Sequence, residues 1–208
     1  MKKILLIIIL IMAIFQINAL STSYTSQYPT QDDDHVKATS KVSTNFWPYF
    51  ATNPELTLTG DYNLNAWLAA NGSVTEQRFH IDLGSAKVIK RIYYENLHDS
   101  GSSTNRGAQN FTFQGSNTEA SFLELTYGTD TGWTNINTAT SVFIQHPDED
   151  IEDPHYITIT NTTAYRYYAF KFADNYGNVS YLGVRRVELQ TEDAEEAGTS
   201  IMFTFSAF

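Results

Sequence analysis

Residues 77–94 read QRFHIDLGSAKVIKRIYY, and this stretch decides the fold class. Its first half alternates polar and apolar residues through Phe79 and Ile81, which is the period-two pattern of a half-buried β-strand. A glycine and a serine then mark a turn, and the run from Lys87 to Tyr94 is dense in β-branched and aromatic residues. We therefore predict two consecutive strands within this stretch.

Short runs of the same kind recur along the chain at roughly even spacing. They occupy residues 77–83, 87–94, 111–115, 141–145, 156–160, 165–172 and 181–189. Asn, Asp, Gly and Ser separate them, and no segment keeps a helical period over three turns. This arrangement is typical of an all-β protein, built as a mostly antiparallel sandwich or barrel.

The composition excludes several classes of protein. The chain has 208 residues, enough for about one domain, and its 14% aromatic and 17% charged residues are not those of a disordered chain. A net charge of −10 argues against nucleic-acid partners, because binding to phosphates needs a basic surface. The absence of cysteine excludes disulfides and thiolate metal sites.

The N-terminus has the three parts of a secretory signal peptide: a basic start at Lys2 and Lys3, a short apolar run, and a small residue at Ala19. We predict a signal peptide over residues 1–19 and a secreted or cell-surface protein. An uncleaved membrane anchor is the alternative, although the apolar run is shorter than the roughly 20 residues that span a bilayer.

Three further segments follow the predicted signal peptide. Residues 20–35 are polar and predict a flexible leader, and residues 36–190 contain the alternating runs of the sandwich. Residues 191–208 form an acidic and then apolar tail. The apolar end of this tail, residues 201–208, predicts an extra edge strand or a surface for self-association.

Three groups of residues resemble a known family when they are taken in order. They are Trp67 followed by FHIDLGSAKVI at 79–89, FTFQGS at 111–116, and YYAFKF at 167–172 followed by LGVRRVEL at 182–189. This series is similar to discoidin domains, also called coagulation factor 5/8 C-type domains, and to family 32 carbohydrate-binding modules. The resemblance implies a galactose-binding-like jelly-roll β-sandwich that holds ligands in the loops at one end. It also implies a protein that is non-catalytic and binds glycans.

Two loops carry the candidate ligand-binding residues. The loop at 96–110, NLHDSGSSTNRGAQN, is longer than a hairpin needs, and long loops on rigid sandwiches are often functional. Its side chains that can hydrogen-bond sugar hydroxyls are His98, Asp99, Arg106 and Asn110. Asn175 adds an amide in a second loop, and the resemblance places a sugar-stacking aromatic there, which is Tyr176. We predict that the two loops meet at one end of the sandwich.

The resemblance also implies a structural calcium ion. Its ligands would be Asp61, Asn63 and Asn65, with Glu188 approaching from the last strand, although the turn before Trp67 is altered to GDYN at 60–63. The alternative is simple turn chemistry, which Asp and Asn favour. The stretch HPDEDIEDPH at 146–155 could also bind a hard cation, but its spacing is irregular and we predict a solvated acidic loop.

No nucleophile elbow, HExxH helix or P-loop occurs in the chain, so we predict that it is not an enzyme. The sequence predicts a secreted carbohydrate-binding or adhesion domain whose partner is a cell-surface or extracellular glycan. The alternative is a structural subunit of a cell-surface or viral appendage that packs through protein–protein contacts.

Overall fold

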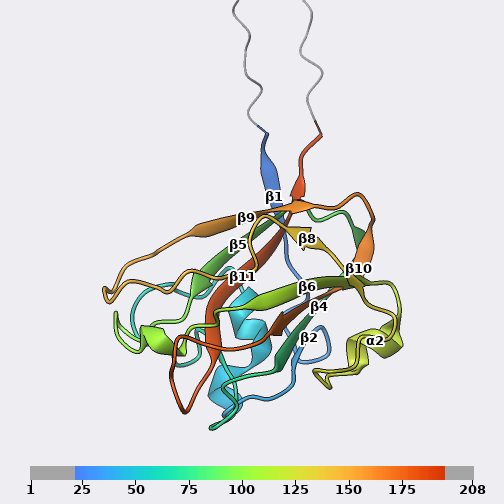
Figure 1. Cartoon of the computed structure of the whole chain (residues 1–208). Coiled ribbons are helices and arrows are strands. Elements are labelled where there is room, and N and C mark those ends of the chain that lie inside the picture. Colours follow the sequence, from blue (N-terminus) through green and yellow to red (C-terminus); the bar gives the residue numbers. More distant parts are fainter. Residues whose placement is uncertain (1–21, 195–208) are drawn as a thin grey trace, which may run out of the picture. The chain divides into compact units, whose positions relative to one another are not determined.

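The computed structural model describes residues 22–194, in which two antiparallel β-sheets pack face to face (Figure 1). The first sheet has the order β1-β11-β5-β9-β8, with β3 also paired to β11. Its strands are β1 (Tyr24–Gln27), β3 (Trp67–Leu68), β5 (Arg91–Asn96), β8 (Asn137–Thr138), β9 (His155–Thr160) and β11 (Gly183–Glu192). The second sheet has the order β2-β4-β10-β6-β7. Its strands are β2 (Val36–Ala38), β4 (Gln77–Lys87), β6 (Phe111–Ser116), β7 (Thr134–Asn135) and β10 (Tyr165–Phe172).

Helices are short and lie in the connections. They are the 3₁₀ turns η1 (Thr44–Phe46), η2 (Pro48–Thr52) and η3 (Thr104–Arg106), and the five-residue α2 (Glu119–Leu123). The described residues are therefore mostly strand and loop, which confirms the all-β prediction. The predicted turn at Gly84 and Ser85 lies inside β4, so this strand continues to Lys87 and the next begins at Arg91.

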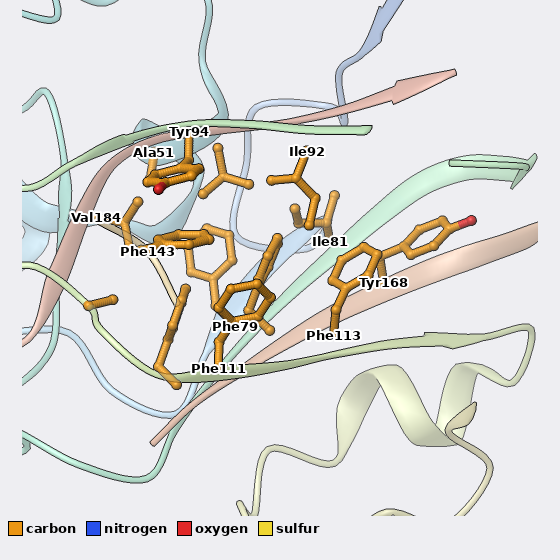
Figure 2. Close-up of a cluster of buried hydrophobic side chains, with 14 of the residues drawn as sticks. Ala51, Phe79, Ile81, Ile92, Tyr94, Phe111, Phe113, Phe143, Tyr168 and Val184 are labelled. Atoms are coloured by element: carbon orange, nitrogen blue, oxygen red, sulfur yellow. The ribbon is translucent and has the colours of Figure 1, made fainter. Parts of the chain in front are cut away.

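Apolar side chains from both sheets fill the space between them (Figure 2). Phe79 and Ile81 of β4 and Phe113 of β6 are at most 1% exposed, as their alternation with polar residues predicts. Ile92 of β5 enters the same core from the facing sheet. The alternating residues of the sequence therefore define the inner faces of the sandwich.

Residues 141–145 are not a strand, so the prediction of a strand there is wrong. Only Val142 forms an isolated bridge, and the segment crosses the core as a loop with Phe143 fully buried. Its backbone bonds to the start of β6, where the Phe143 N–H donates to the Gln109 carbonyl and the Phe111 N–H donates to the Ser141 carbonyl, both at 2.9 Å. Side chains bond to Ile144: its N–H donates to the Tyr94 hydroxyl at 2.8 Å, and Asn96 Nδ2 donates to its carbonyl at 2.9 Å.

Part of the leader predicted at 20–35 forms a regular element, the edge strand β1. Tyr24–Gln27 pairs with β11 in register from Tyr24 opposite Glu192 to Gln27 opposite Leu189. The short polar segment supplies an edge strand because its backbone groups complete the β11 ladder. The compact unit accordingly spans Tyr24–Glu192 rather than the predicted 36–190.

The predicted signal peptide at 1–19 and most of the predicted tail at 191–208 lie outside the described residues, including the apolar end at 201–208. Within residues 22–194, no helix is long and apolar enough to cross a membrane.

Candidate functional site

Several loops meet at one end of the sandwich. Asn178, in the loop after β10, donates its amide to Asn105 Oδ1 at 3.2 Å, and the backbones of Ala108 and Asn175 form a bridge. The loop before β3 joins them, since the Ser100 N–H donates to the Gly60 carbonyl at 3.0 Å. These contacts confirm that the loop of Arg106 and the loop of Tyr176 lie together.

Arg106 lies where three of these loops come together. Its Nη1 donates to the Tyr62 hydroxyl at 2.8 Å, and its guanidinium carbon is 5.2 Å from the centre of the Tyr181 ring. The side chains of all three residues are partly exposed. Arg106 Nε is buried and has no hydrogen-bond partner among the described residues. The loop end therefore presents a cation beside two tyrosine rings.

Sequence reasoning missed both tyrosines of this group. Tyr62 lies in the altered turn at 60–63, and Tyr181 ends the loop that contains the predicted Tyr176. Burial raises the pKa of Tyr62, so its hydroxyl is neutral and accepts from Arg106. The sequence does show Tyr62 and Tyr181 as aromatic residues among polar neighbours in loops. It does not show that the two rings lie beside Arg106, because that depends on tertiary contacts.

His98 is corrected from a ligand-binding residue to a structural one. It has no exposed surface, and both ring nitrogens have partners: Nε2 donates to the Leu58 carbonyl at 2.7 Å, and Nδ1 accepts the Gly101 N–H at 3.1 Å. Burial lowers the pKa of His98, which favours the neutral ring that these two bonds require. His98 therefore shapes its loop from inside and does not reach a ligand.

Asn110 and Asn175 are also used inside the protein. Asn110 Nδ2 donates to both oxygens of Asp174 at 2.9 Å. Asn175 is 9% exposed, and its amide donates to the carbonyls of Asn178 and Tyr181 at 2.9 and 2.7 Å. We correct their predicted role, because these side chains fix the loop between β10 and β11 and leave little free for a ligand.

The side chains of Asp99 and Tyr176 are partly exposed to solvent. The Asp99 backbone pairs with Ser102, and burial, together with the nearby Asp61, raises the pKa of the Asp99 carboxyl. The Tyr176 hydroxyl donates to the Phe143 carbonyl, and burial raises its pKa. Both side chains are half-buried, so each has surface for a ligand, although the Tyr176 hydroxyl is already bonded.

The acidic stretch at 146–155 is largely exposed and is held to the neighbouring loops at a few points. His146 is buried and its ring stacks on His98, with centroids 4.0 Å apart. Asp150 Oδ1 accepts the Gly60 N–H at 2.7 Å. Residues 147–152 are all exposed, so the structure agrees with the predicted solvated acidic loop, although some of its groups also bond to neighbouring loops.

The predicted calcium ligands do not form a calcium site. Glu188 accepts from Ser26 at 2.6 Å and Tyr28 at 3.0 Å, so its carboxylate faces β1. Asp61 Oδ1 accepts the Asn63 N–H at 2.7 Å, which is ordinary turn chemistry.

The amide of Asn65 donates to the carbonyls of Asp61 and Asn63, both at 3.1 Å. Within residues 22–194, no group of three or more His, Asp or Glu side chains could hold a metal ion. The residues present therefore do not fit the expected ion.

A cavity of about 250 Å³ lies beside β2. Trp47, Lys37 and Lys41 are among its lining residues, and Lys41 Nζ is 3.6 Å from the centre of the Trp47 ring. None of the residues predicted to bind ligand lines this cavity. It provides a second aromatic surface with which the loop end can be compared experimentally.

Comparisons with known proteins identify the fold. No protein-family model and no curated protein matches the chain. Among solved structures, chitosan-binding module 1 of a chitosanase/glucanase from Paenibacillus sp. IK-5 is 20% identical, with a TM-score of 0.52 over 79% of this chain and 98% of that chain. The family 32 carbohydrate-binding module of C. perfringens NanJ, in complex with galactose, is 14% identical, with a TM-score of 0.50 over 81% of this chain and 100% of that chain.

A third structure contains a family 32 module joined to the alginate lyase domain of AlyQ. It is 19% identical to this chain, with a TM-score of 0.51, and covers 84% of this chain but 35% of that one. At these identities the likeness concerns the fold alone. The chain shares the β-sandwich fold of these family 32 carbohydrate-binding modules, as the sequence resemblance implies.

Proposed function

We propose that this chain is a non-catalytic carbohydrate-binding domain that recognises a glycan through the loop end of its β-sandwich. The observation that carries the proposal is the group formed by Arg106, Tyr62 and Tyr181, in which a guanidinium lies beside two partly exposed tyrosine rings from different loops. Its fold is that of modules named for binding chitosan and galactose, which supports the proposal.

Sugar recognition needs an apolar face for the C–H side of the ring and a few fixed polar groups for its hydroxyls. The tyrosine rings provide the first, and the planar guanidinium of Arg106 can donate paired bonds to adjacent hydroxyls or to a carboxylate. Asn105 and Asn178 hold each other at the edge of the same surface and add amide groups. A shallow polar surface of this kind recognises a sugar without changing it.

Nearby carboxylates have structural partners, which favours binding over catalysis. Glycoside hydrolysis needs two carboxyl groups that face each other across the sugar, roughly 5–9.5 Å apart. At the loop end, Asp150 accepts from the Gly60 backbone and Asp174 accepts from Asn110. These bonds hold the loops in place, and we propose no catalytic role for either residue.

We propose further that the domain is secreted or held at a cell surface, where its glycan partner is found. The basic, apolar and small-residue segments at 1–19 support this proposal, as they are the parts of a secretory signal.

A glycan array probed with the full chain tests the proposed function, and Arg106→Gln tests the site. Arg106→Gln removes the cation and should abolish detectable binding, because the guanidinium is the central polar group of the surface. The matched control is Arg166→Gln. Arg166 lies at the opposite end of β10 from the loops and pairs with Asp82 at 2.7 Å.

The control variant should bind as the unmodified chain does, since Arg166 lies at the far end of β10 and contacts none of the loop residues named above. No glycan binding by the unmodified chain would contradict the proposed function. Equal binding by the two variants would place the site elsewhere.

A further inference from the structure

Four backbone carbonyl oxygens converge on one buried guanidinium beneath the loop end. Arg185 donates to the carbonyls of Thr59 at 2.6 Å, Gly60 at 3.1 Å, Thr57 at 3.3 Å and His98 at 3.3 Å. Its side chain has no exposed surface. One side chain therefore joins the loop before β3 to the loop after β5, and these are the loops that carry Tyr62 and Arg106.

An irregularity in β11 places this guanidinium. The register of β11 against β5 shifts between Val184, opposite Asn96, and Arg186, opposite Glu95, so that Arg185 is the extra residue. A bulge of this kind redirects side chains. Arg186 is aimed at the same loop, since its Nη2 donates to the Leu56 carbonyl at 2.8 Å. Two consecutive arginines thus bind a run of carbonyls that have no strand partner.

Arg185 is charged despite its burial. Burial lowers the pKa of Arg185 to about 10, which still leaves the guanidinium protonated at neutral pH. The carboxylates of Asp150, Asp99 and Asp61 act on it favourably. A cation surrounded by carbonyl oxygens and nearby carboxylates is the environment that proteins build for a calcium ion.

We propose that Arg185 is the internal cation of this loop end and occupies the structural role of a calcium ion, so that the loops are positioned without metal. The four carbonyl oxygens that converge here are already bonded to guanidinium N–H groups. A divalent ion brought among them would also be repelled by the charge of Arg185. If the proposed function holds, glycan binding is independent of calcium, and Arg185 is a positioning residue for the glycan site.

The first test measures the thermal midpoint of the full chain in excess chelator and in millimolar calcium, without glycan. We expect the two midpoints to be the same. A resident calcium site filled at about a hundred times its Kd would raise the midpoint by roughly 5–10 °C, and a rise of that size would overturn the proposal. Because no glycan is present, this result does not depend on whether the proposed function is correct.

The second test is local and uses hydrogen exchange on Arg185→Met. This change keeps an apolar stem and removes the donors, so amides that hold the two loops together should exchange faster. They include the N–H of Ser100, bonded to the Gly60 carbonyl, and the N–H of Gly60, bonded to Asp150. Amides of the β4 and β10 ladder should keep their protection, and unchanged exchange in the loops would contradict the proposal.

Arg185→Lys serves if the methionine variant does not fold. Lysine keeps the charge but has one nitrogen in place of the planar fork, so it cannot reach all four carbonyls. It should also speed exchange in the two loops, and full protection in this variant would show that the fork geometry is not needed.

Discussion

Truncating Phe143 to alanine should destabilise the protein more than its position in a loop would suggest. The side chain is fully buried, and its ring stacks on Tyr94 with centroids 3.9 Å apart (Figure 2). It also contacts the rings of Phe111 at 4.9 Å and Phe172 at 5.6 Å. Large-to-small changes of buried Phe cost about 3–5 kcal/mol, and the aromatic contacts place this one near the upper end, at about 4–5 kcal/mol.

For a domain of this size, that loss corresponds to a fall in thermal midpoint of about 8–20 °C. The measurement is reversible thermal or denaturant unfolding of Phe143→Ala beside Ile144→Ala. Ile144 is the next residue and is 54% exposed, so its truncation should change the free energy of unfolding by about 0.5 kcal/mol or less. Equal losses in the two variants would show that residues 141–145 do not close the core.

Three further predictions concern stability. Phe113→Ala in β6 should cost about 3–5 kcal/mol in denaturant unfolding, and a loss below about 1 kcal/mol would contradict the strand register. Burial lowers the pKa of His80 to about 4, so the unfolded chain binds more protons between pH 6.5 and 4. Stability should therefore fall by about 3 kcal/mol as the pH drops through this range, and His80→Gln should flatten the slope. The pKa of Asp82 is lowered overall: burial acts to raise it, but the hydrogen bonds from Arg166 and Gly84 have the larger, opposite effect. This pKa difference stabilises the fold above the unfolded pKa near 4, and the stabilisation is lost as the pH falls further. The loss should be smaller in Arg166→Gln, and an equal loss of stability with acid in the two proteins would contradict this prediction.

The inner faces of the sandwich could be predicted because each depends on a local period of two. Phe79, Ile81 and Phe113 alternate with polar residues, and all three are buried. The segment at 141–145 has the same composition, but it makes only an isolated bridge with Asn110, and a Tyr94 hydroxyl and an Asn96 amide bond to Ile144. Sequence spacing cannot show that side chains will bond to backbone groups that a longer ladder would pair.

The meeting of the two candidate loops could be predicted, but several of their side chains have other roles than expected. The order of the strands, together with the family resemblance, predicts the loop of Arg106 beside the loop of Tyr176, and the structure confirms that they lie together. His98 looked like a polar loop residue, yet it is buried because its own loop and the loop at 58 close around it. Arg185 looked like a strand residue, and its role depends on a bulge that sequence alone does not reveal.

The central claim is that a glycan binds at the loop end, and its most direct test is to map the contact. Backbone amide shifts of the full chain should be recorded by NMR during titration with a glycan selected on the array. The account predicts that the changes gather at Arg106, Tyr181 and their loop neighbours, while the amides around Arg166 and Asp82, at the opposite end of β10 from the loops, stay unchanged. Shifts confined to the surroundings of Trp47, with the loop end unaffected, would contradict it.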